Sequence, residues 1–402
     1  MKVLVLNCGS SSVKYQLLLM PGEELLARGL VERIGEGRAV HIFEPQTEAF
    51  EYHGQQEFEL GRIGHEAALR AILDTLQGKG QTDMTIEAVG HRVVHGGESF
   101  TEAVKVDGGV KEAIRDCISL APLHNPPNLV GIEAAEDLLP GIPNVAVFDT
   151  AFHQTLPPEA YRYAIPARYY HEYRLRRYGF HGTSHRYVAG RAAEMLGTSL
   201  DGLRLLTCHL GNGCSIAAIK DGQSVETSMG FTPLEGLIMG TRSGDLDPAV
   251  VTHIQRVDGI GPEEAIAILN KDSGLLGLSG YSNDMRDIEG GRDRGNDGAR
   301  LAFDGFVHRV KKYIGAYTAV LNGLDGIVFT AGIGQKSPAV REAVCRDMEG
   351  LGITFSPKKN QQMGKTGEGR VDDGGPVAVL VVKTNEELAI AREAHRVVSQ
   401  AT

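Results

Sequence analysis

The chain has 402 residues, which predicts roughly two to three domains, and its 42% hydrophobic and 23% charged content is ordinary for a globular protein. A formal net charge of −10 argues against a broad nucleic-acid surface, which is normally basic, but allows a small anion in a local positive pocket. No apolar run reaches the ~18 residues of a membrane helix, and the five cysteines include no C-x-x-C pair. We therefore expect no membrane and no nucleic-acid partner, and reduced, buried thiols in a cytoplasmic protein.

The N-terminal segment predicts a β-hairpin with a polar tip. Residues 3–6 are a short apolar run and residues 13–19 read as a second strand, with NCGSSS between them at 7–12. Small residues let the backbone approach an anion, and Lys14 supplies positive charge, so the tip could hold phosphate. An ordinary serine-rich turn is the alternative, and this segment by itself slightly favours it.

The rest of the first half mixes strands and helices. Residues 1–95 are rich in strand signals, and residues 111–140 look helical except for the loop at 121–129, where Pro126 and Pro127 are expected to forbid helix. Residues 145–148 predict a buried strand that ends at Asp149. A second domain is expected to begin near residue 150, after the turn at 141–144.

The second half repeats the opening pattern. Residues 203–219 again read as strand, Gly-rich turn and strand, with GNGCS at 211–215 in the place of NCGSS at 7–11. An internal duplication is therefore predicted, with two similar domains that each present a loop to one cleft.

A long helix is expected near 297–322, a strand at 326–330, a tight turn at 331–334 before a helix at 338–348, and a strand at 375–382. The alternation of strands with helices predicts an α/β protein. Thr384 is the expected N-cap of the last helix, with Glu387 reaching back as a capping box, which leaves Glu386 for another role.

Common nucleotide and metal motifs are absent. The segment GKT at 364–366 lacks the first glycine of a P-loop, because residue 359 is lysine, and neither Gly-x-Gly turn has the third glycine of a dinucleotide fingerprint. His181 and His185 have zinc-like i, i+4 spacing, but a zinc protease would carry glutamate after the first histidine, and Gly182 is a poor helix residue. We favour one loop histidine and one structural histidine.

Two arginines stand among glycines at predicted strand ends, Arg92 in GHRVVHGGE and Arg242 in MGTRSGDLDP. A guanidinium held there matches a carboxylate or phosphate with its planar fork. For one arginine a surface turn is the better interpretation. Two such arginines together with two phosphate-type hairpins favour an anion clamp.

Taken together, eight segments resemble the acetokinase family, and they span nearly the whole chain in order. They are NCGSSSVKYQL (7–17), GHRVVHGGE (90–98), APLHNPPNL (121–129), FDTAFHQTLP (148–157), YGFHGTSHRYV (178–188), HLGNGCSI (209–216), TSMGFTPLEGLIMGTRSGDLDP (227–248) and TNEELAIAR (384–392). The resemblance implies two duplicated ribonuclease-H-like domains of the actin-like ATPase type around a central cleft. It places the N-terminal domain at 1–150, completed by the C-terminal helix 384–402. Residues 151–383 would form the C-terminal domain, with nucleotide binding and the interface of a homodimer.

The resemblance also implies an activity: reversible, Mg²⁺-dependent, in-line transfer of the ATP γ-phosphoryl group to acetate, giving ADP and acetyl phosphate, with Mn²⁺ as a substitute metal. The implied catalytic residues are Asp149, His181, Arg242 and Arg92. The implied acetate site comprises Arg92, Val94, Leu123, Phe180 and Pro233. The implied metal site comprises Asn7, Glu386 and Asp149. The implied ATP site comprises Ser10, Ser12, Lys14, His209, Leu210, Gly211, Asn212, Gly213, Asp284, Met285, Arg286, Gly332, Ile333, Gly334, Gln335 and Lys336.

The chain departs from the family pattern at a few positions. Glu226 stands before TSMG where the family usually has aspartate, Gln335-Lys336 stand where it has Glu-Asn, and Lys383 replaces proline. The changes at 335 and 336 bear on nucleotide affinity and base preference more than on the chemistry. A propionate kinase of the same family is the close alternative, although Val94 would narrow the pocket in favour of acetate. A non-catalytic ATP-driven switch on the same fold is the distant one, and the paired arginines argue against it.

Overall fold

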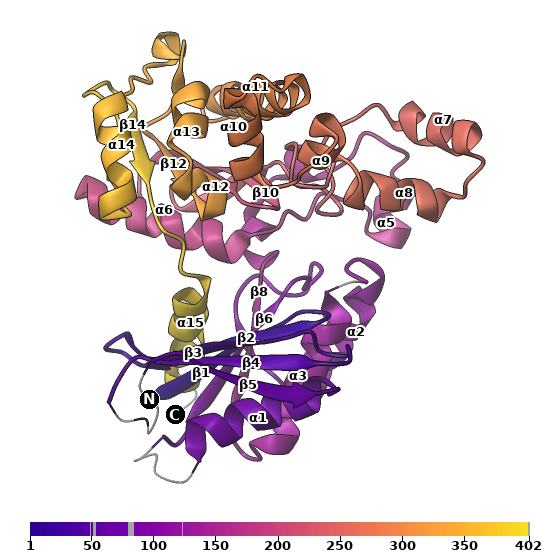
Figure 1. Cartoon of the computed structure of the whole chain (residues 1–402), viewed down its shortest axis with the longest axis vertical. Helices are drawn as coiled ribbons and strands as arrows, with labels where there is room; N and C mark the ends of the chain where they lie inside the picture. Colours follow the sequence, from indigo (N-terminus) through magenta and orange to yellow (C-terminus); the bar gives the residue numbers. More distant parts are fainter. Residues whose placement is uncertain (49, 51–53, 79–83, 123, 401–402) are drawn as a thin grey trace. The chain divides into compact units, whose positions relative to one another are not determined.

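The computed structural model describes residues 1–48, 50, 54–78, 84–122 and 124–400. The chain forms two compact units, of which unit 1 contains Met1–Phe152 and Asn385–Thr402 and unit 2 contains His153–Thr384. Each unit has one β-sheet with helices packed on it (Figure 1). Among the described residues, no helix has both the length and the apolar character needed to span a membrane.

Unit 1 holds an eight-stranded sheet in the order β5-β4-β3-β2-β1-β6-β8-β7. Its strands are β1 (Lys2–Cys8), β2 (Ser12–Leu19), β3 (Glu24–Glu32), β4 (Ala39–Pro45), β5 (Gln56–Gly61), β6 (Ala88–Val93), β7 (Val104–Lys105) and β8 (Asn144–Phe148). Its helices are α1 (His65–Gln77), α2 (Gly108–Asp116), α3 (Asn125–Leu138) and α15 (Glu386–Gln400), with a 3₁₀ turn at Cys117–Ser119. A further 3₁₀ turn, Ala151–Thr155, joins the two units in sequence.

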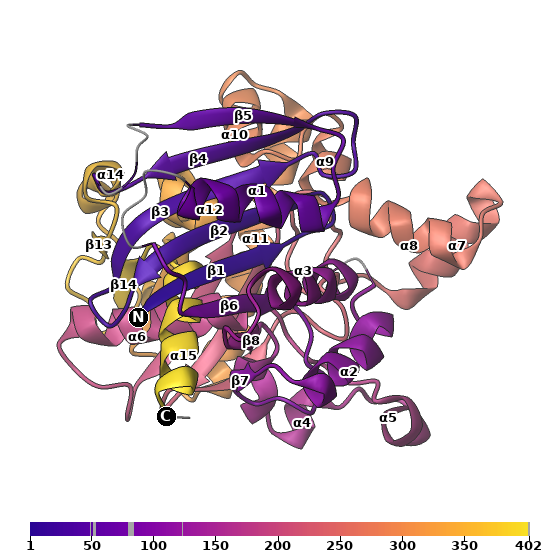
Figure 2. The ribbon, with the colours of Figure 1, turned by 90° about the horizontal axis from the view of Figure 1, so that it is seen from below.

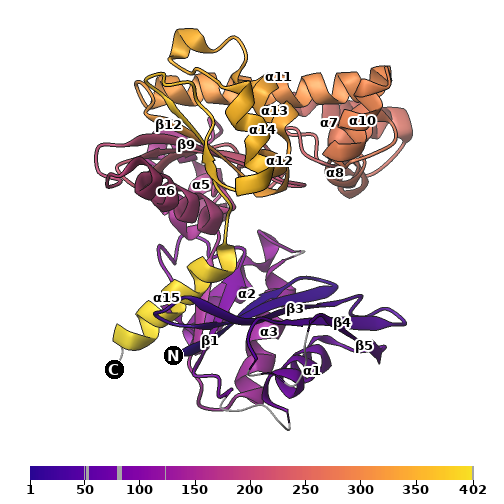
Figure 3. The same ribbon diagram turned by 60° about the vertical axis from the view of Figure 1, so that its left-hand side comes forward.

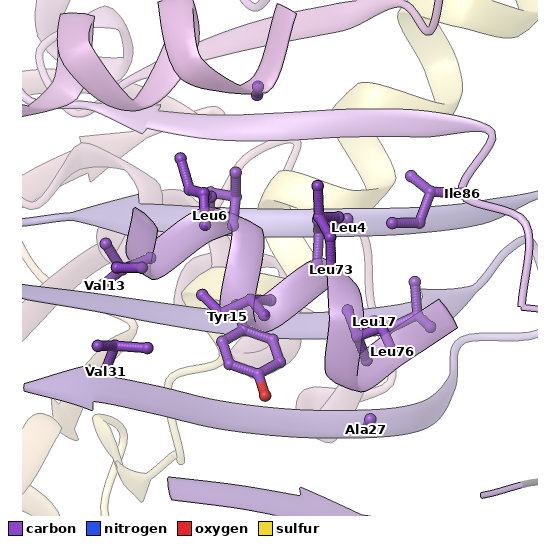
Figure 4. Close-up of a cluster of buried hydrophobic side chains, with 14 of the residues drawn as sticks. Leu4, Leu6, Val13, Tyr15, Leu17, Ala27, Val31, Leu73, Leu76 and Ile86 are labelled. Carbon is purple, nitrogen blue, oxygen red and sulfur yellow. The ribbon is translucent and has the colours of Figure 1, made fainter. Parts of the chain in front are cut away.

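Helices cover both faces of the unit 1 sheet, with α1 and α3 on one face and α15 on the other (Figures 1 and 2). Alternate side chains of β1 and β2, such as Leu4, Leu6 and Tyr15, point into a core that Leu73 and Leu76 of α1 complete (Figure 4). Full burial of each such aliphatic side chain contributes roughly 1.5–3 kcal/mol. This core fixes the strands whose ends carry the polar residues predicted for the site.

Unit 2 holds a six-stranded sheet in the order β11-β10-β9-β12-β14-β13. Its strands are β9 (Arg204–Leu210), β10 (Cys214–Lys220), β11 (Gln223–Thr227), β12 (Gly326–Thr330), β13 (Gly369–Arg370) and β14 (Ala378–Val381). Its helices are α4 (Pro158–Tyr161), α5 (Arg168–Tyr173), α6 (Gly182–Leu196), α7 (Pro248–Asp258), α8 (Pro262–Lys271), α9 (Gly274–Ser279), α10 (Met285–Asp293), α11 (Asp297–Val320), α12 (Ala331–Lys336), α13 (Pro338–Cys345) and α14 (Pro357–Thr366), with a 3₁₀ turn at Glu349–Leu351. The sheet lies between α6 and α11 (Figure 3).

The two sheets share one topology. The order β3-β2-β1-β6-β8 in unit 1 matches β11-β10-β9-β12-β14 in unit 2. In both, the first two pairings are antiparallel and the last two are parallel. The predicted duplication and the α/β fold class are therefore confirmed, and both predicted hairpins form, as β1–β2 and β9–β10.

Three local predictions are wrong. Pro126 and Pro127 do not break a helix but occupy the first turn of α3, where a missing N–H costs nothing because no intrahelical acceptor awaits it. Residues 331–334, expected as a turn, begin the short helix α12. The stretch 1–95 is β-rich as predicted, and it also contains the amphipathic helix α1. The last helix starts one residue later than expected, because Asn385 Oδ1 rather than Thr384 accepts the N–H of Leu388, 3.1 Å away.

Candidate active site

The first hairpin places Asn7 and Lys14 opposite each other as a cross-strand pair on β1 and β2. The turn between them is closed by the N–H of Gly9, which donates to the carbonyl of Ser12 at 2.7 Å. Ser10 is exposed at the tip and Ser12 is half-buried. The predicted phosphate-loop residues of unit 1 are thus neighbours on one hairpin.

Arg92, at the end of β6, gathers the predicted catalytic and metal residues of unit 1. Its guanidinium donates to Asp149 Oδ2 from Nε (3.0 Å) and from Nη2 (2.6 Å), and Nη1 donates to Asn7 Oδ1 at 3.3 Å. Glu386 Oε2, on the first turn of α15, lies 4.0 Å from Arg92 Nε. Residues that are far apart in the sequence therefore surround one guanidinium.

Two asparagines of α3 hold the chain just after Arg92. Asn128 Oδ1 accepts the N–H of Val94 at 3.0 Å, and its Nδ2 donates to the carbonyl of Cys8 at 2.7 Å. Asn125 accepts the N–H of His95 and donates back to the same residue's carbonyl. These bonds satisfy buried backbone groups at the ends of two strands and fix where β6 presents Arg92.

Burial and charge act in opposite directions on Arg92. Burial disfavours its charged form, but the attraction of Asp149 and Glu386 outweighs this, and the pKa of Arg92 is raised. Burial also raises the pKa of Glu386 to about 7, an effect that Arg92 opposes and Asp149 reinforces. Unit 1 thus contains a half-buried guanidinium between the buried carboxylate of Asp149 and the half-buried carboxyl group of Glu386.

The donor set around Arg92 suits a hard divalent cation. Asn7, Asp149 and Glu386 offer one amide and two carboxylate oxygens, the ligand type that Mg²⁺ prefers, and Mg²⁺ usually takes only one or two protein carboxylates and completes its shell with water and phosphate. Within the described part of the chain, no group of three or more His, Cys, Asp or Glu residues could by itself hold a metal. The residues therefore fit a metal that shares its ligands with a bound nucleotide.

In unit 2, a second arginine and a histidine converge beside the second hairpin. A Cβ atom on Gly213 would lie 3.5 Å from both Arg242 Nη1 and His181 Nε2. The Arg242 guanidinium makes a weak contact with Met239 Sδ at 3.9 Å, and among the described residues no carboxylate forms an ion pair with it. Burial consequently lowers the pKa of Arg242. The space left by the absent Gly213 side chain is suited to an anion.

Imidazole rings and hydroxyl groups line this part of unit 2. The rings of His181 and His209 are stacked, with centroids 4.2 Å apart and planes inclined by 16°. His181 Nδ1 lies 2.8 Å from Ser215 Oγ, and His209 Nδ1 lies 2.8 Å from Ser184 Oγ. His185 is fully buried within the same network. The pattern HGTSH therefore supplies one histidine at the loop–helix junction and one structural histidine.

A cavity of about 470 Å³ adjoins the second hairpin. Eight residues predicted for ATP line it: Gly211, Asn212, Asp284, Met285, Arg286, Gly332, Ile333 and Lys336. Asp284 caps α10 by accepting the N–H of Arg286 at 2.8 Å, and also binds that residue's guanidinium. The loop 211–213 thus runs from this cavity to the side of Arg242 and His181.

Several predicted residues lie away from these groups. Leu210 and Gly334 are buried, and Gln335 turns to donate to the carbonyl of Gly367 at 3.2 Å. Of the four residues predicted for the methyl pocket, Val94 belongs to unit 1 and Phe180 to unit 2, and both are buried. Pro233 is half-buried in unit 2, and Leu123 lies outside the described residues.

Sequence reasoning missed two sets of residues. Asn283, Glu289 and Ser337 also line the cavity, and the Asn283–Asp284 helix-start signal before α10 could have found the first of them. The second set is the network of Ser184, Ser215 and Thr207 around the histidines. Ser215 stands in the repeated turn pattern, but no signal in the sequence shows what its hydroxyl contacts.

A model of the Acetokinase family matches residues 2–392. The chain belongs to the acetokinase family. An acetate kinase of Thermotoga petrophila is 55% identical over 408 residues, which cover 100% of this chain and 99% of that protein. Among solved structures, Porphyromonas gingivalis acetate kinase is 46% identical with a TM-score of 0.92, covering 99% of both chains. A Francisella tularensis propionate kinase is 40% identical with a TM-score of 0.91, covering 98% of this chain and 99% of that one.

Within this acetokinase fold, Glu226, where the family usually has aspartate, lies in a half-buried cluster of charged side chains. Burial raises the pKa of Glu226, and Arg177 Nε, 3.7 Å away, opposes the rise. Arg177 Nη2 also donates to Glu235 Oε1 at 2.5 Å. The longer side chain of glutamate is thus accommodated by an arginine that serves two carboxylates.

Proposed function

We propose that the chain catalyses the reversible transfer of the γ-phosphoryl group of ATP to acetate, which yields ADP and acetyl phosphate. Family membership and the 55% identity to an acetate kinase support the reaction. The observation that carries the proposal is the convergence of Arg242 and His181 on the space beside Gly213, next to a cavity that could accept a nucleoside.

The cavity of unit 2 is proposed to hold the adenosine, with loop 211–213 directing the polyphosphate toward Arg242. Its volume of about 470 Å³ lies in the ordinary range for small-molecule sites, ~300–1,000 Å³. Lys14 and the tip of the first hairpin, in unit 1, are proposed to contact the same polyphosphate. Backbone N–H groups at Gly-rich turns suit such contacts.

Phosphoryl transfer depends mainly on positioning and charge stabilisation. A carboxylate acceptor is already ionised at neutral pH, since model carboxyl groups have a pKa near ~4. No general base is therefore needed in this direction, and Asp149 is assigned to positioning and metal binding. Arg92 and Arg242 would offset the repulsion between acetate and the transferred group, while the His181 ring donates a hydrogen bond to one of its oxygens.

Asn7, Asp149 and Glu386 are the residues proposed to hold Mg²⁺, with Mn²⁺ as a substitute. When bound, the cation would neutralise charge on the polyphosphate. These three side chains also contact Arg92, so the cation would lie beside a guanidinium that is proposed to bind the acceptor carboxylate.

Propionate is the second candidate acceptor, because a propionate kinase is among the similar solved structures. One methylene group in an apolar pocket changes discrimination by only ~1–3 kcal/mol. The buried Val94, 5% exposed, favours the smaller acid if it lines the pocket.

We also propose a cytoplasmic homodimer formed through unit 2. All five cysteines are free and buried, which is consistent with a reducing compartment. Helix α7 buries none of its residues in the single chain and exposes Val250 and Val257 by 43% and 69% (Figure 1). Covering such an apolar face would favour association, and light scattering of the purified chain would show a mass of twice 43.3 kDa.

The test is incubation with ATP, Mg²⁺ and hydroxylamine together with acetate, propionate or butyrate. Acyl hydroxamate formed best from acetate would support the proposal. Faster formation from propionate would move the assignment to the second candidate. Formation from none of the acids would overturn the enzyme assignment and favour an ATP-driven switch.

A further inference from the structure

A chain of three hydrogen bonds leads from the core of unit 2 to His181. Ser215 Oγ lies 2.8 Å from His181 Nδ1 and 2.8 Å from His185 Nε2, and His185 Nδ1 lies 2.7 Å from Thr207 Oγ1. Ser215, His185 and Thr207 are each fully buried. The far nitrogen of His181, Nε2, is the one that faces the space beside Gly213.

The donors in this series of hydrogen bonds can all point in either of two directions. In the outward direction, Thr207 donates to His185 Nδ1, His185 Nε2–H donates to Ser215, and Ser215 donates to His181 Nδ1. The neutral His181 ring then keeps its proton on Nε2. In the inward direction every donor is reversed, and a neutral His181 presents a bare lone pair at Nε2.

The surroundings favour neutral imidazole rings, so the direction matters. His181 stacks on His209 at 4.2 Å, and Arg242 approaches the same space beside Gly213, so a proton added to His181 would meet another ring and a fixed cation. Burial, together with His153 and His209, lowers the pKa of His185 well below its usual value. A neutral His181 can donate to an anion only from a protonated Nε2.

The backbone shows that the ring position is specified. His181 has φ +56°, in the left-handed region that residues other than glycine seldom adopt. Such a conformation persists only where surrounding contacts hold it. Two contacts of the ring can hold it: the hydrogen bond between Nδ1 and Ser215, and the stacking on His209.

We propose that Ser215 is a positioning residue that holds His181 in the Nε2–H tautomer, and that His185 and Thr207 set the direction of its hydroxyl. The inference deepens the proposed function and rests on it, because the need for a donor at Nε2 follows from an anion in that space. Ser215 itself does not touch the transferred group.

The experiment is ¹⁵N NMR of the full chain labelled at histidine, at neutral pH, with His181→Gln used to assign the His181 signals. Wild type should show Nε2 protonated and Nδ1 bare. Ser215→Ala should give a mixture of tautomers or the reversed one. We expect kcat to fall by ~10–100-fold, the cost known for removing a partner that orients a metal-ligating histidine, with KM for acetate nearly unchanged.

Thr207→Val is the second variant, since it is nearly isosteric and does not contact His181. It should shift the His181 tautomer in the same direction by a smaller amount. Ser224→Ala is the matched control, because Ser224 Oγ makes an equally buried 2.8 Å contact with His153 Nδ1, and it should leave the His181 signals unchanged.

Protonated Nδ1 in wild type, or an unchanged tautomer in both Ser215→Ala and Thr207→Val, would overturn the inference. The tautomer is read without turnover, so it is independent of the hydroxamate assay. A chain that shows the expected shifts but forms no acyl hydroxamate would retain the tautomer assignment and lose the proposed function.

Discussion

The two units form the same hairpin, but the arginine beside it has carboxylate partners in unit 1 and none among the described residues in unit 2. In unit 1, Arg92 lies against Asp149 and Glu386, and its pKa is raised. In unit 2, Arg242 has no carboxylate partner among the described residues, and burial lowers its pKa. The duplication therefore preserved the backbone and not the charge.

The difference assigns the two arginines different tasks. Arg92 already lies against two carboxyl groups, so an incoming anion would gain less from its charge than from that of Arg242. Arg242 carries a buried charge that only an incoming anion would compensate, which makes an anion more favourable there.

The largest expected effect comes from breaking the charge pair of unit 1. Asp149→Asn should lower kcat by about 10³-fold, or about 4 kcal/mol, and raise the Mg²⁺ concentration needed for half-maximal rate, because it removes a proposed metal ligand and leaves Arg92 with a weaker partner. Steady-state kinetics across a Mg²⁺ titration would measure both.

Asp325→Asn is the matched control, since Asp325 makes a similar two-pronged pair with Arg204 away from the site. It should leave kcat within about twofold, as expected for a partly exposed pair. Unchanged Mg²⁺ dependence in Asp149→Asn, with loss of a step in the pH–rate profile, would instead identify Asp149 as a proton acceptor.

We expect His91, which precedes Arg92 on β6, to make the stability of the fold depend on pH. His91 is buried, and burial lowers its pKa to about 4, while its Nε2–H donates to Asn144 Oδ1 at 2.7 Å. In the unfolded chain the pKa of this histidine is ~6.5, so as the pH falls the unfolded state binds the proton before the folded state does. The contribution of neutral His91 to the free energy of unfolding is therefore fully present above pH ~6.5. It is lost as the pH falls toward about 4, which lowers the free energy of unfolding by about 3 kcal/mol.

His91→Gln should keep the bond to Asn144 and remove this loss. Urea unfolding of wild type and variant at pH 7 and at pH 4 would show a smaller acid-induced drop in the free energy of unfolding for the variant. Equal drops would mean that His91 is protonated in the folded chain.

The uncompensated arginine gives the next effect. Arg242→Lys keeps a positive charge but loses the planar fork, and we expect kcat to fall about 10²-fold, in the range for loss of one transition-state donor. Because the interaction would strengthen in the transition state, kcat and kcat/KM should fall together. A rise in KM with unchanged kcat would contradict the role given to Arg242.

Repetition and apolar periodicity were enough to predict both hairpins and the α/β class. The errors arose where one residue type has two positional meanings. Pro126 and Pro127 read as helix breakers but lie in the first turn of α3. Thr384 was the expected cap, yet its hydroxyl contacts Ser184 at 2.8 Å, and Asn385 caps the helix. Local preference could not decide between these, because tertiary contacts did.

The site was predictable residue by residue only through family resemblance. Nothing in the sequence joins Asn7, Arg92 and Asp149 until β1, β6 and β8 pair side by side. Ser215 was missed for the same reason: its two imidazole partners come from the start and the first turn of α6. Strand pairing and helix docking, rather than motif spacing, create these contacts.

The smallest effects are expected at Gln335 and Lys336 of α12, the two positions where the family usually has Glu-Asn. Lys336 lines the cavity and is exposed, so Lys336→Asn should change KM for ATP by no more than about threefold, or well under 1 kcal/mol, as for other solvent-screened charges. Gln335 points away toward Gly367, so Gln335→Glu should leave KM for ATP unchanged. Steady-state kinetics of both variants with ATP and with GTP as donor would measure these KM values and the base preference. A larger effect at 335 than at 336 would mean that α12 rearranges when nucleotide binds.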